Sequence, residues 1–456
     1  MRTFSNPEEK RQYLTQEPIP RLILTMALPA IVSMLISSFY NMADTFFVGQ
    51  TNNPYMVAGT SLILPVFNIT LCLAGLAGIG GGSLIARLLG QAKEQEARRV
   101  SAFSFYLALG IAALFSVGIA VFMHPILGLL GAGENTYEYA RQYAFCVIVL
   151  GGIPTVLSNV LSNLIRSIGR SREASVGIIL GGLLNIALDP LFMFVLLPDG
   201  YEVLGAGIAT CLSNVLSVVY FLLCLVRQRN ESVIGLHPRH LRHSRKYLGN
   251  ILAIGFPSAL QYALTVVAVA AQSRFVSQYT TEAVAALGIV KKLDQLPLYF
   301  SIGVSNGLLP LLAYHYAAGQ QEKRRAAFRL GAGISLLFAL VCLVLFEGFA
   351  PQLAALFIDD ATTIHYAAGF LRRMVIAMPM MSLCYPLIIQ FQAMGKARES
   401  LVCSILRKGV LDIPLLFLMD TLLPLYGCMW VQPMVDGISL VAATAFYRRL
   451  RRRGEA

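Results

Sequence analysis

The chain has 456 residues, of which 56% are hydrophobic and only 13% are charged. Soluble globular proteins carry about 25% charged residues, so this composition excludes a soluble enzyme, a disordered protein and a disulfide scaffold. The net charge of +12 would suggest nucleic acid binding in a soluble protein. In a membrane protein it is an orientation signal, and we expect no nucleic acid partner.

The first 21 residues are polar and contain no apolar core followed by a cleavage site, so we expect no cleaved signal peptide. Twelve apolar runs follow, each long enough to cross about 30 Å of hydrocarbon as a helix. Continuous runs are not typical of an outer-membrane barrel, whose strands alternate. The predicted spans cover residues 22–48, 57–82, 100–123, 138–165, 174–197, 203–226, 249–278, 283–316, 326–348, 364–394, 400–419 and 424–447.

Basic residues alternate between the two sides of these spans. The N-terminal segment, the even-numbered connections and the C-terminal tail carry most of the 36 lysines and arginines. The odd-numbered connections carry none; they cover residues 49–56, 124–137, 198–202, 279–282, 349–363 and 420–423. Because basic loops remain in the cytoplasm, we expect a multi-pass protein of the bacterial inner membrane with both termini cytoplasmic.

The chain also repeats itself. The segment RLLGQAKEQEARR (87–99) returns as YAAGQQEKRR (316–325), which we align with Gly90 on Gly319. The segment RSIGRSREAS (166–175) returns as QAMGKARESL (392–401), with Gly169 on Gly395. Five proline pairs follow the same order: Pro29 with Pro257, Pro65 with Pro297, Pro125 with Pro351, Pro154 with Pro379, and Pro190 with Pro414.

Each half of this repeat carries six spans, so both halves enter the membrane in the same direction. Two parallel bundles with substrate between them is a known transporter plan. The sequence therefore predicts an all-α membrane protein with an N-terminal six-helix bundle (1–226), a cytoplasmic linker (227–248) and a C-terminal six-helix bundle with a basic tail (249–456).

Four segments resemble a known family: ALPAIVSMLISSFYNMADTFFVGQ, GIGGGSLIARLLGQ, IRSIGRSREA and LGIVKKLDQLPLYFSIGVSNGLLPLLAYHYAAG. They are similar to the MATE family (multidrug and toxic compound extrusion), in its DinF-like branch near the MepA-type bacterial drug exporters. The resemblance implies a V-shaped pair of bundles around a central cavity. It also implies efflux of amphipathic organic cations in antiport with protons or sodium, by alternating access.

The NorM-like branch of that family has a Glu in the seventh span and an Asp in the tenth. Residues 249–278 and 364–394 contain no carboxylate here. This departure favours the DinF-like branch and an ion-coupling site in the N-terminal half.

The first span supports that assignment, because Ser33, Ser37, Asn41 and Asp44 lie on successive turns of one helix face. A carboxylate inside the membrane is costly and is a functional candidate by default. A structural hydrogen bond between helices is the alternative role for Asp44.

In the fifth span, Asn185 and Asp189 are one turn apart, and Pro190 leaves the carbonyl of Ile186 without its helical donor. Free carbonyl and carboxylate oxygens suit a hard cation such as sodium, and protonation is the other way to tolerate a buried acid. A local helix cap is the alternative role for Asp189. In the family, the residues aligned with Asp44, Asn185 and Asp189 form the cation site with a sixth-span hydroxyl, for which Thr210 is our candidate.

The repeat gives a contrast in chemistry. The positions that match Ser33, Ser37, Asn41 and Asp44 are Gln261, Thr265, Val269 and Gln272, so the acid has become an amide. Five residues of the second half are candidates for the substrate cavity: Gln261, Gln272, Asp294, Tyr385 and Asp436. Asp436 is the only acid of the twelfth span, whereas Asp294 with Lys291 and Asp412 with Lys408 are interpreted first as intrahelical ion pairs.

We find no nucleophile–base–acid set, no Walker sequence and no metal motif, so we expect neither an enzyme nor a cofactor and an ion gradient as the energy source. In the linker, His237, His240 and His243 leave a zinc site as an alternative to a solvated basic loop. A flippase for a lipid-linked saccharide remains the alternative function, although such flippases often have fourteen spans and basic cavities. We expect a monomer in the lipid bilayer.

Overall fold

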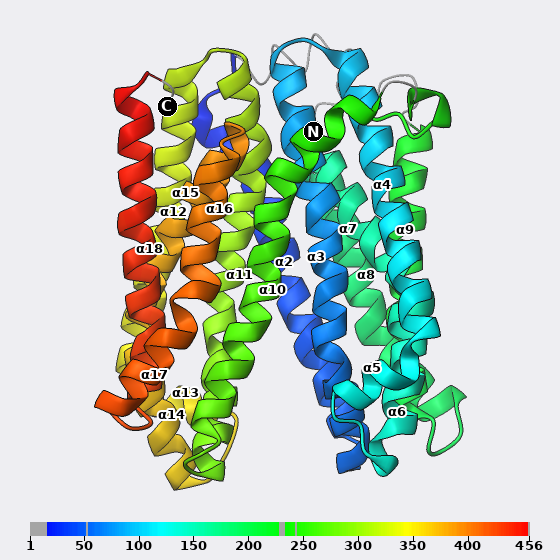
Figure 1. Cartoon of the computed structure of the whole chain (residues 1–456), viewed down its shortest axis with the longest axis vertical. Coiled ribbons are helices and arrows are strands. Elements are labelled where there is room, and N and C mark those ends of the chain that lie inside the picture. The colour runs from blue at the N-terminus through cyan, green and yellow to red at the C-terminus, as the bar shows by residue number, and fades with distance from the viewer. Residues whose placement is uncertain (1–15, 52, 228–232, 242–243, 455–456) are drawn as a thin grey trace.

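The computed structural model describes residues 16–51, 53–227, 233–241 and 244–454. Helices joined by short turns account for these residues, and no strand occurs among them. The helices stand side by side in two groups, α2–α9 and α10–α18, which are called the N-bundle and the C-bundle below (Figure 1). The all-α fold is therefore confirmed.

The N-bundle is built from rods that run the length of the molecule, some of them assembled from consecutive helical segments. In chain order they are α2 (Ile19–Gly49); α3 (Pro54–Gly90); α4 (Glu94–Val121), followed by the short α5 (Met123–Leu129); α6 (Glu134–Ala144), the π-helical η1 (Phe145–Leu150) and α7 (Gly152–Ser167); α8 (Ser171–Leu191) with the π-helical η2 (Phe192–Leu196); and α9 (Glu202–Arg227).

The C-bundle repeats this plan after two 3-10 turns, η3 (Pro238–Leu241) and η4 (Ser244–Tyr247). Its rods are α10 (Leu248–Val276); α11 (Thr281–Ala317); α12 (Gln321–Gly348), followed by the short α13 (Ala350–Ala355); α14 (Ala361–Met374) with α15 (Ala377–Ala393); α16 (Ala397–Ile405), the π-helical η5 (Leu406–Val410) and α17 (Asp412–Leu422); and α18 (Gly427–Arg452).

Length and hydropathy alone identify eight spans among the described residues, or ten when the bent pairs α6–α7 and α14–α15 each count once. The two remaining rods do not meet the length or hydropathy requirement, each because of a local feature. The rod α16–α17 is interrupted at Lys408 and Gly409, whose backbone angles are not helical, and α18 carries Gln432 and Asp436 within its apolar stretch. With them the described residues form twelve rods, six in each bundle, as expected.

The internal repeat is visible in the shape of the helices. The fourth rod of each bundle bends, by 45° between α6 and α7 and by 46° between α14 and α15. The paired prolines Pro154 and Pro379 each occupy the third position after the bend. Proline is tolerated in a first helical turn, where its missing N–H costs no internal hydrogen bond. The same sequence feature therefore accompanies the same bend in both halves.

One alignment within the repeat is wrong. The backbone enters the left-handed region after α3 at Ala92 (φ 60°) and after α11 at Gly319 (φ 75°), so these two residues are equivalent. Gly90 has a different role, because a Cβ there would meet the carbonyl oxygen of Tyr314 across the bundle interface. The pairing of Gly169 with Gly395 agrees with the structure, since both have positive φ (81° and 74°).

The bundles meet at the end where α2 begins and α18 ends, which is called the terminal end below (Figure 1). Glycines let the backbones approach: a Cβ on Gly255 would meet the backbone of Leu76, and one on Gly307 would meet that of Ala27. Around them α2 and α11 share a buried apolar cluster that includes Leu22 and Leu308. Close packing through small residues is the main source of helix association in lipid.

Further along the interface, Ser38 of α2 donates a hydrogen bond to Gln295 of α11 at 3.4 Å. Beyond this level the ribbons of the two bundles diverge toward the opposite end, which is called the far end below (Figure 1). At the terminal end, the connection before α10 is held against α4, where Tyr247 donates to Glu96 at 2.8 Å and Tyr106 donates to the carbonyl of Leu236 at 3.1 Å.

Candidate functional site

A polar cavity of about 190 Å³ lies in the N-bundle beside the interface. Helices α2, α7, α8 and α9 supply hydroxyls and side-chain amides to its lining, whereas α3 supplies only apolar residues. The C-bundle contributes Tyr262, Tyr299, Ile302 and Asn306. Of the predicted coupling residues, Asn41, Asn185 and Thr210 face this cavity. A cavity rich in amides and hydroxyls can both solvate an ion and hold the polar part of an amphipathic molecule.

The two predicted carboxylates lie behind the far-end part of this cavity. Asp44 is near the end of α2, and Asp189, which is fully buried, is near the end of α8. Asn185 donates from its Nδ2 to Asp189 Oδ1 at 3.1 Å and to Thr210 Oγ1 at 3.3 Å. The structure therefore brings Asn185, Asp189 and Thr210 into one contact chain.

Tyr143 connects Asp44 to this group and was not anticipated from the sequence. Its hydroxyl donates to Asp44 Oδ2 at 3.5 Å, and its ring lies against Gly207 of α9, one turn before Thr210. Tyr143 stands just before the π-helical segment η1, in the bent fourth rod. Nothing in the local pattern around residue 143 distinguishes it, because the contact depends on how α6 is rotated against α2.

Three oxygen atoms of this group have no hydrogen-bond partner among the described residues although they are buried: Asp44 Oδ1, Asn185 Oδ1 and Asp189 Oδ2. Buried oxygens without partners are costly. Protonation of a carboxylate, or binding of a hard cation by these oxygens, would reduce that cost. The other predicted member, Asn41, donates to the carbonyl of Ser37 at 2.9 Å and borders the cavity.

A buried arginine, Arg166, lies at the end of the cavity opposite the two carboxylates. Arg166 lies in the last turn of α7, is only 4% exposed and lines the cavity. Its Nη2 donates to Ser162 Oγ at a long 3.4 Å, and its Nε has no partner among the described residues. Asn159 and Asn163 share its helix face, and this spacing of two amides and an arginine could have revealed the lining from sequence.

The five candidates in the C-bundle lie outside that cavity lining. Gln272, the counterpart of Asp44, donates to the carbonyl of Cys428 at 3.0 Å, and Gln261 accepts from Ser404 at 3.5 Å. Asp294 is partly buried on α11. Gln272 is therefore a structural tie between α10 and α18 in this conformation.

Asp436 is the clearest correction. It is not a lone acid, because Arg407 Nε donates to Asp436 Oδ1 at 2.9 Å. The two side chains are 1% and 0% exposed. The guanidinium of Arg407 also lies 4.1 Å from the ring centre of Tyr385. An acid neutralised and enclosed in this way does not face a substrate cation in this conformation.

Lys408 and Asp412 also differ from the expectation of an intrahelical ion pair. Lys408 donates to Gln432 at 2.7 Å, and Asp412 accepts the backbone N–H of Gly409 at 2.8 Å. The physical reason is the break in η5: Gly409 has φ 141°, so the helical spacing that would bring positions 408 and 412 together is lost. Asp412 instead binds a backbone N–H within the break, three residues before it.

In the linker, the rings of His237 and His240 lie 6.4 Å apart, and Arg239 N–H donates to His237 Nδ1 at 3.1 Å. His243 lies outside the described residues. Among those that are described, no group of three His, Cys, Asp or Glu side chains could hold a metal ion.

Twelve membrane-crossing rods in two repeated bundles, with a polar cavity beside their interface and unpaired buried carboxylates behind it, define a multi-pass membrane transporter. A family model described as MatE matches residues 29–191 and 257–418. The chain therefore belongs to the MATE transporter family, which is not a class of enzymes.

Relatives and solved structures agree with this assignment. The multidrug export protein MepA of Staphylococcus aureus is 27% identical over 448 residues, which are 98% of this chain and 97% of that protein. The MepA of Staphylococcus saprophyticus is 28% identical over 450 residues, again 98% of this chain and 97% of that protein.

Among solved structures, an outward-facing multidrug resistance MATE family transporter of the MOP superfamily superposes with a TM-score of 0.89 at 24% identity, over 100% of this chain and 99% of that one. A MOP superfamily transporter from Pyrococcus furiosus, described as having a binding pocket of reverse polarity, superposes with a TM-score of 0.86 at 25% identity. The superposition covers 99% of this chain and 98% of that one.

Proposed function

We propose that this protein is a secondary active exporter of amphipathic organic cations, driven by the inward flow of protons or sodium. The observation that carries the proposal is the group of three unpartnered buried oxygens on Asp44, Asn185 and Asp189, next to a polar cavity. Such oxygens are stabilised when an ion or proton binds, which is the property that a coupling site requires. The names of the MepA relatives support drugs as the exported class.

In this mechanism Asp44, Asn185 and Asp189 alternate between an ion-bound and an ion-free form, with Thr210 and Asn41 at the border of the cavity. Ion binding from one side removes negative charge and lowers the affinity of the site for a cationic substrate. Release of the ion on the other side restores the charge. Because each ligand favours a different state, binding of one drives release of the other.

The proposal assigns the terminal end to the cytoplasm. The alternation of basic and non-basic connections supports this orientation. With that assignment, the glycine-mediated contacts between the bundles close the cytoplasmic side, and the divergence of the bundles faces outward. We propose that the protein is a monomer in a bacterial inner membrane, since the two bundles of a single chain enclose the whole cavity.

A second candidate is a flippase for a lipid-linked saccharide, and Arg166 is the observation that favours it. A buried guanidinium beside several amides suits a phosphate and sugar hydroxyls. The two unpaired carboxylates favour the cation exporter, because a phosphate is repelled by them.

Transport by the purified protein in vesicles distinguishes the cation exporter from the saccharide flippase. Efflux of a fluorescent organic cation is followed after a proton gradient or a sodium gradient is imposed separately. Acceleration by one gradient, with release of the counter-ion, supports antiport and identifies the ion. If neither gradient moves the dye while a lipid-linked saccharide crosses the bilayer, the exporter proposal is wrong.

A further inference from the structure

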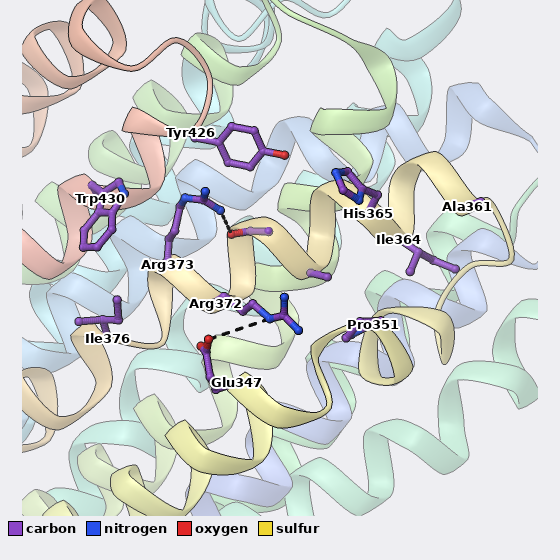
Figure 2. A pocket seen from close by; sticks show the side chains of 12 residues that line it. Glu347, Pro351, Ala361, Ile364, His365, Arg372, Arg373, Ile376, Tyr426 and Trp430 are labelled. Carbon is purple, nitrogen blue, oxygen red and sulfur yellow. Dashed lines mark hydrogen bonds and ion pairs between the residues drawn. The ribbon is translucent and has the colours of Figure 1, made fainter.

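A second cavity, of about 710 Å³, opens at the far end of the C-bundle, away from the coupling residues. It lies between the end of α12, the start of α13, the helix α14 and the start of α18 (Figure 2). Its polar lining consists of Glu347, His365, Arg372, Arg373, Tyr426 and Trp430. The proposed transport mechanism uses none of these residues.

Arg373 is held in a fixed position. Its Nη1 donates to the carbonyl of Gly369 at 2.7 Å, and its guanidinium lies 4.3 Å from the ring centre of Tyr426 (Figure 2). Gly369 makes this arrangement fit, since a Cβ at that position would approach Tyr426 Cε1 to 2.9 Å. An arginine has five N–H donors, and this one uses a single donor on protein atoms among the described residues. The guanidinium is therefore preorganised and still able to bind an oxyanion.

Arg372 and Glu347 form the other side of the pocket. Their closest N–O distance is 4.0 Å, and the two side chains are 50% and 53% exposed. A pair that is this long and this exposed contributes little, so both groups can exchange partners. The pocket thus offers two guanidinium groups and, within the same space, one carboxylate. A ligand that carries an oxyanion and a cation a few bonds apart matches this charge pattern.

The position of the pocket indicates where such a ligand comes from. Tyr426 and Trp430, the only tryptophan of the chain, stand near the start of α18 at the end of the hydrocarbon-crossing region. Tyrosine and tryptophan favour that level of a bilayer. Ile376, an apolar residue that lines the pocket, is 39% exposed. A pocket whose polar lining is joined by the apolar residues Ile364 and Ile376, at this depth, suits a headgroup with attached acyl chains.

We infer that this pocket binds the headgroup of a membrane phospholipid that carries both a phosphodiester and a primary ammonium group. The phosphate oxygens accept from Arg372 and Arg373, the ammonium contacts Glu347, and the acyl chains lie along the apolar residues toward the bilayer. The inference does not depend on the transport proposal, because it concerns the opposite bundle and is tested by binding alone.

The test uses the full-length protein, purified in detergent, and native mass spectrometry to count retained lipid. Phosphatidylethanolamine and phosphatidylglycerol are offered at equal concentrations, since the second has the phosphate but no ammonium. We expect the wild-type protein to retain phosphatidylethanolamine preferentially. Arg373→Gln removes a charged donor and should reduce its retention about tenfold.

Two variants make the result specific. Glu347→Gln changes a half-exposed side chain, so folding is preserved, and it should abolish the preference for phosphatidylethanolamine over phosphatidylglycerol. Arg141→Gln is the matched control: it neutralises an arginine at the far end of the other bundle that also pairs with a glutamate, Glu138, at 2.6 Å. Retention by this control should equal that of the wild type.

Soluble glycerophosphoethanolamine distinguishes a membrane lipid from a free headgroup. If the soluble compound fails to displace bound lipid, the acyl chains contribute and the inference is supported. Displacement at concentrations similar to that of the lipid would overturn the membrane source. A lipid preference that Glu347→Gln leaves unchanged, or equal retention by the wild type and Arg373→Gln, would overturn the headgroup assignment itself.

Discussion

Asp44→Asn separates the role of Asp44 in ion coupling from a role in stability. In the structure, Asp44 Oδ2 accepts one long hydrogen bond, of 3.5 Å, from Tyr143, and Oδ1 has no partner among the described residues. An asparagine oxygen can accept the same bond. The free energy of unfolding should therefore change by less than about 1 kcal/mol, the net value of an ordinary hydrogen bond.

The effect on coupling should be large. If sodium is the coupling ion, the amide lacks the charge that binds it, and a charged contact is worth about 1.5–3 kcal/mol. This corresponds to a loss of about 10- to 100-fold in ion affinity. If the ion is a proton, the amide cannot bind it, and coupling is lost completely. Either way, gradient-driven export should fall to that of protein-free vesicles at physiological ion concentrations.

The assay compares dye efflux and thermal unfolding for the wild type, Asp44→Asn and Asp199→Asn. Asp199 is an exposed acid in the connection between η2 and α9, so its neutralisation changes the net charge equally without touching the cavity. Export should be normal in this control. A folded Asp44→Asn protein that exports at the wild-type rate would remove Asp44 from the mechanism, and a large loss of stability would support the structural alternative.

Three other predictions concern charged residues and orientation. Asp189→Asn should impair export far more than Asp412→Asn, measured as rate per folded protein, because Asp412 accepts one backbone N–H that an asparagine oxygen can also accept; the reverse order would place coupling in the C-bundle. Asp436→Asn should destabilise the protein by about 3–5 kcal/mol in thermal unfolding, because it leaves a fully buried guanidinium without its counter-charge; an unchanged unfolding temperature would show that the pair is not buried in the membrane-embedded protein. Single cysteines introduced at residues 198–202 should react with a membrane-impermeant reagent from outside and Arg239→Cys only from inside; outside labelling of position 239 would reverse the topology.

The number of spans was predictable because it depends on a local quantity. A helix must present about 20 apolar residues to cross a bilayer, and that requirement can be counted along the chain. The same holds for the faces of single helices: Asn185 and Asp189, one turn apart, do form a hydrogen bond at 3.1 Å. The duplicated prolines likewise mark bends of nearly equal angle in the two halves.

The neighbours of each side chain were decided only by the tertiary structure. Helical periodicity shows which residues share a face, but it does not fix the rotation of that helix or the helix opposite. For this reason the sequence does not reveal Tyr143 as the partner of Asp44 across 99 residues of chain, or Arg407 as the partner of Asp436 at 2.9 Å. The expected pair of Lys408 and Asp412 failed because a local break removes the periodicity itself. In a low-dielectric interior a buried charge needs a partner close in space. Which residue becomes that partner depends on how the helices pack against one another, and the local sequence of one helix does not specify this.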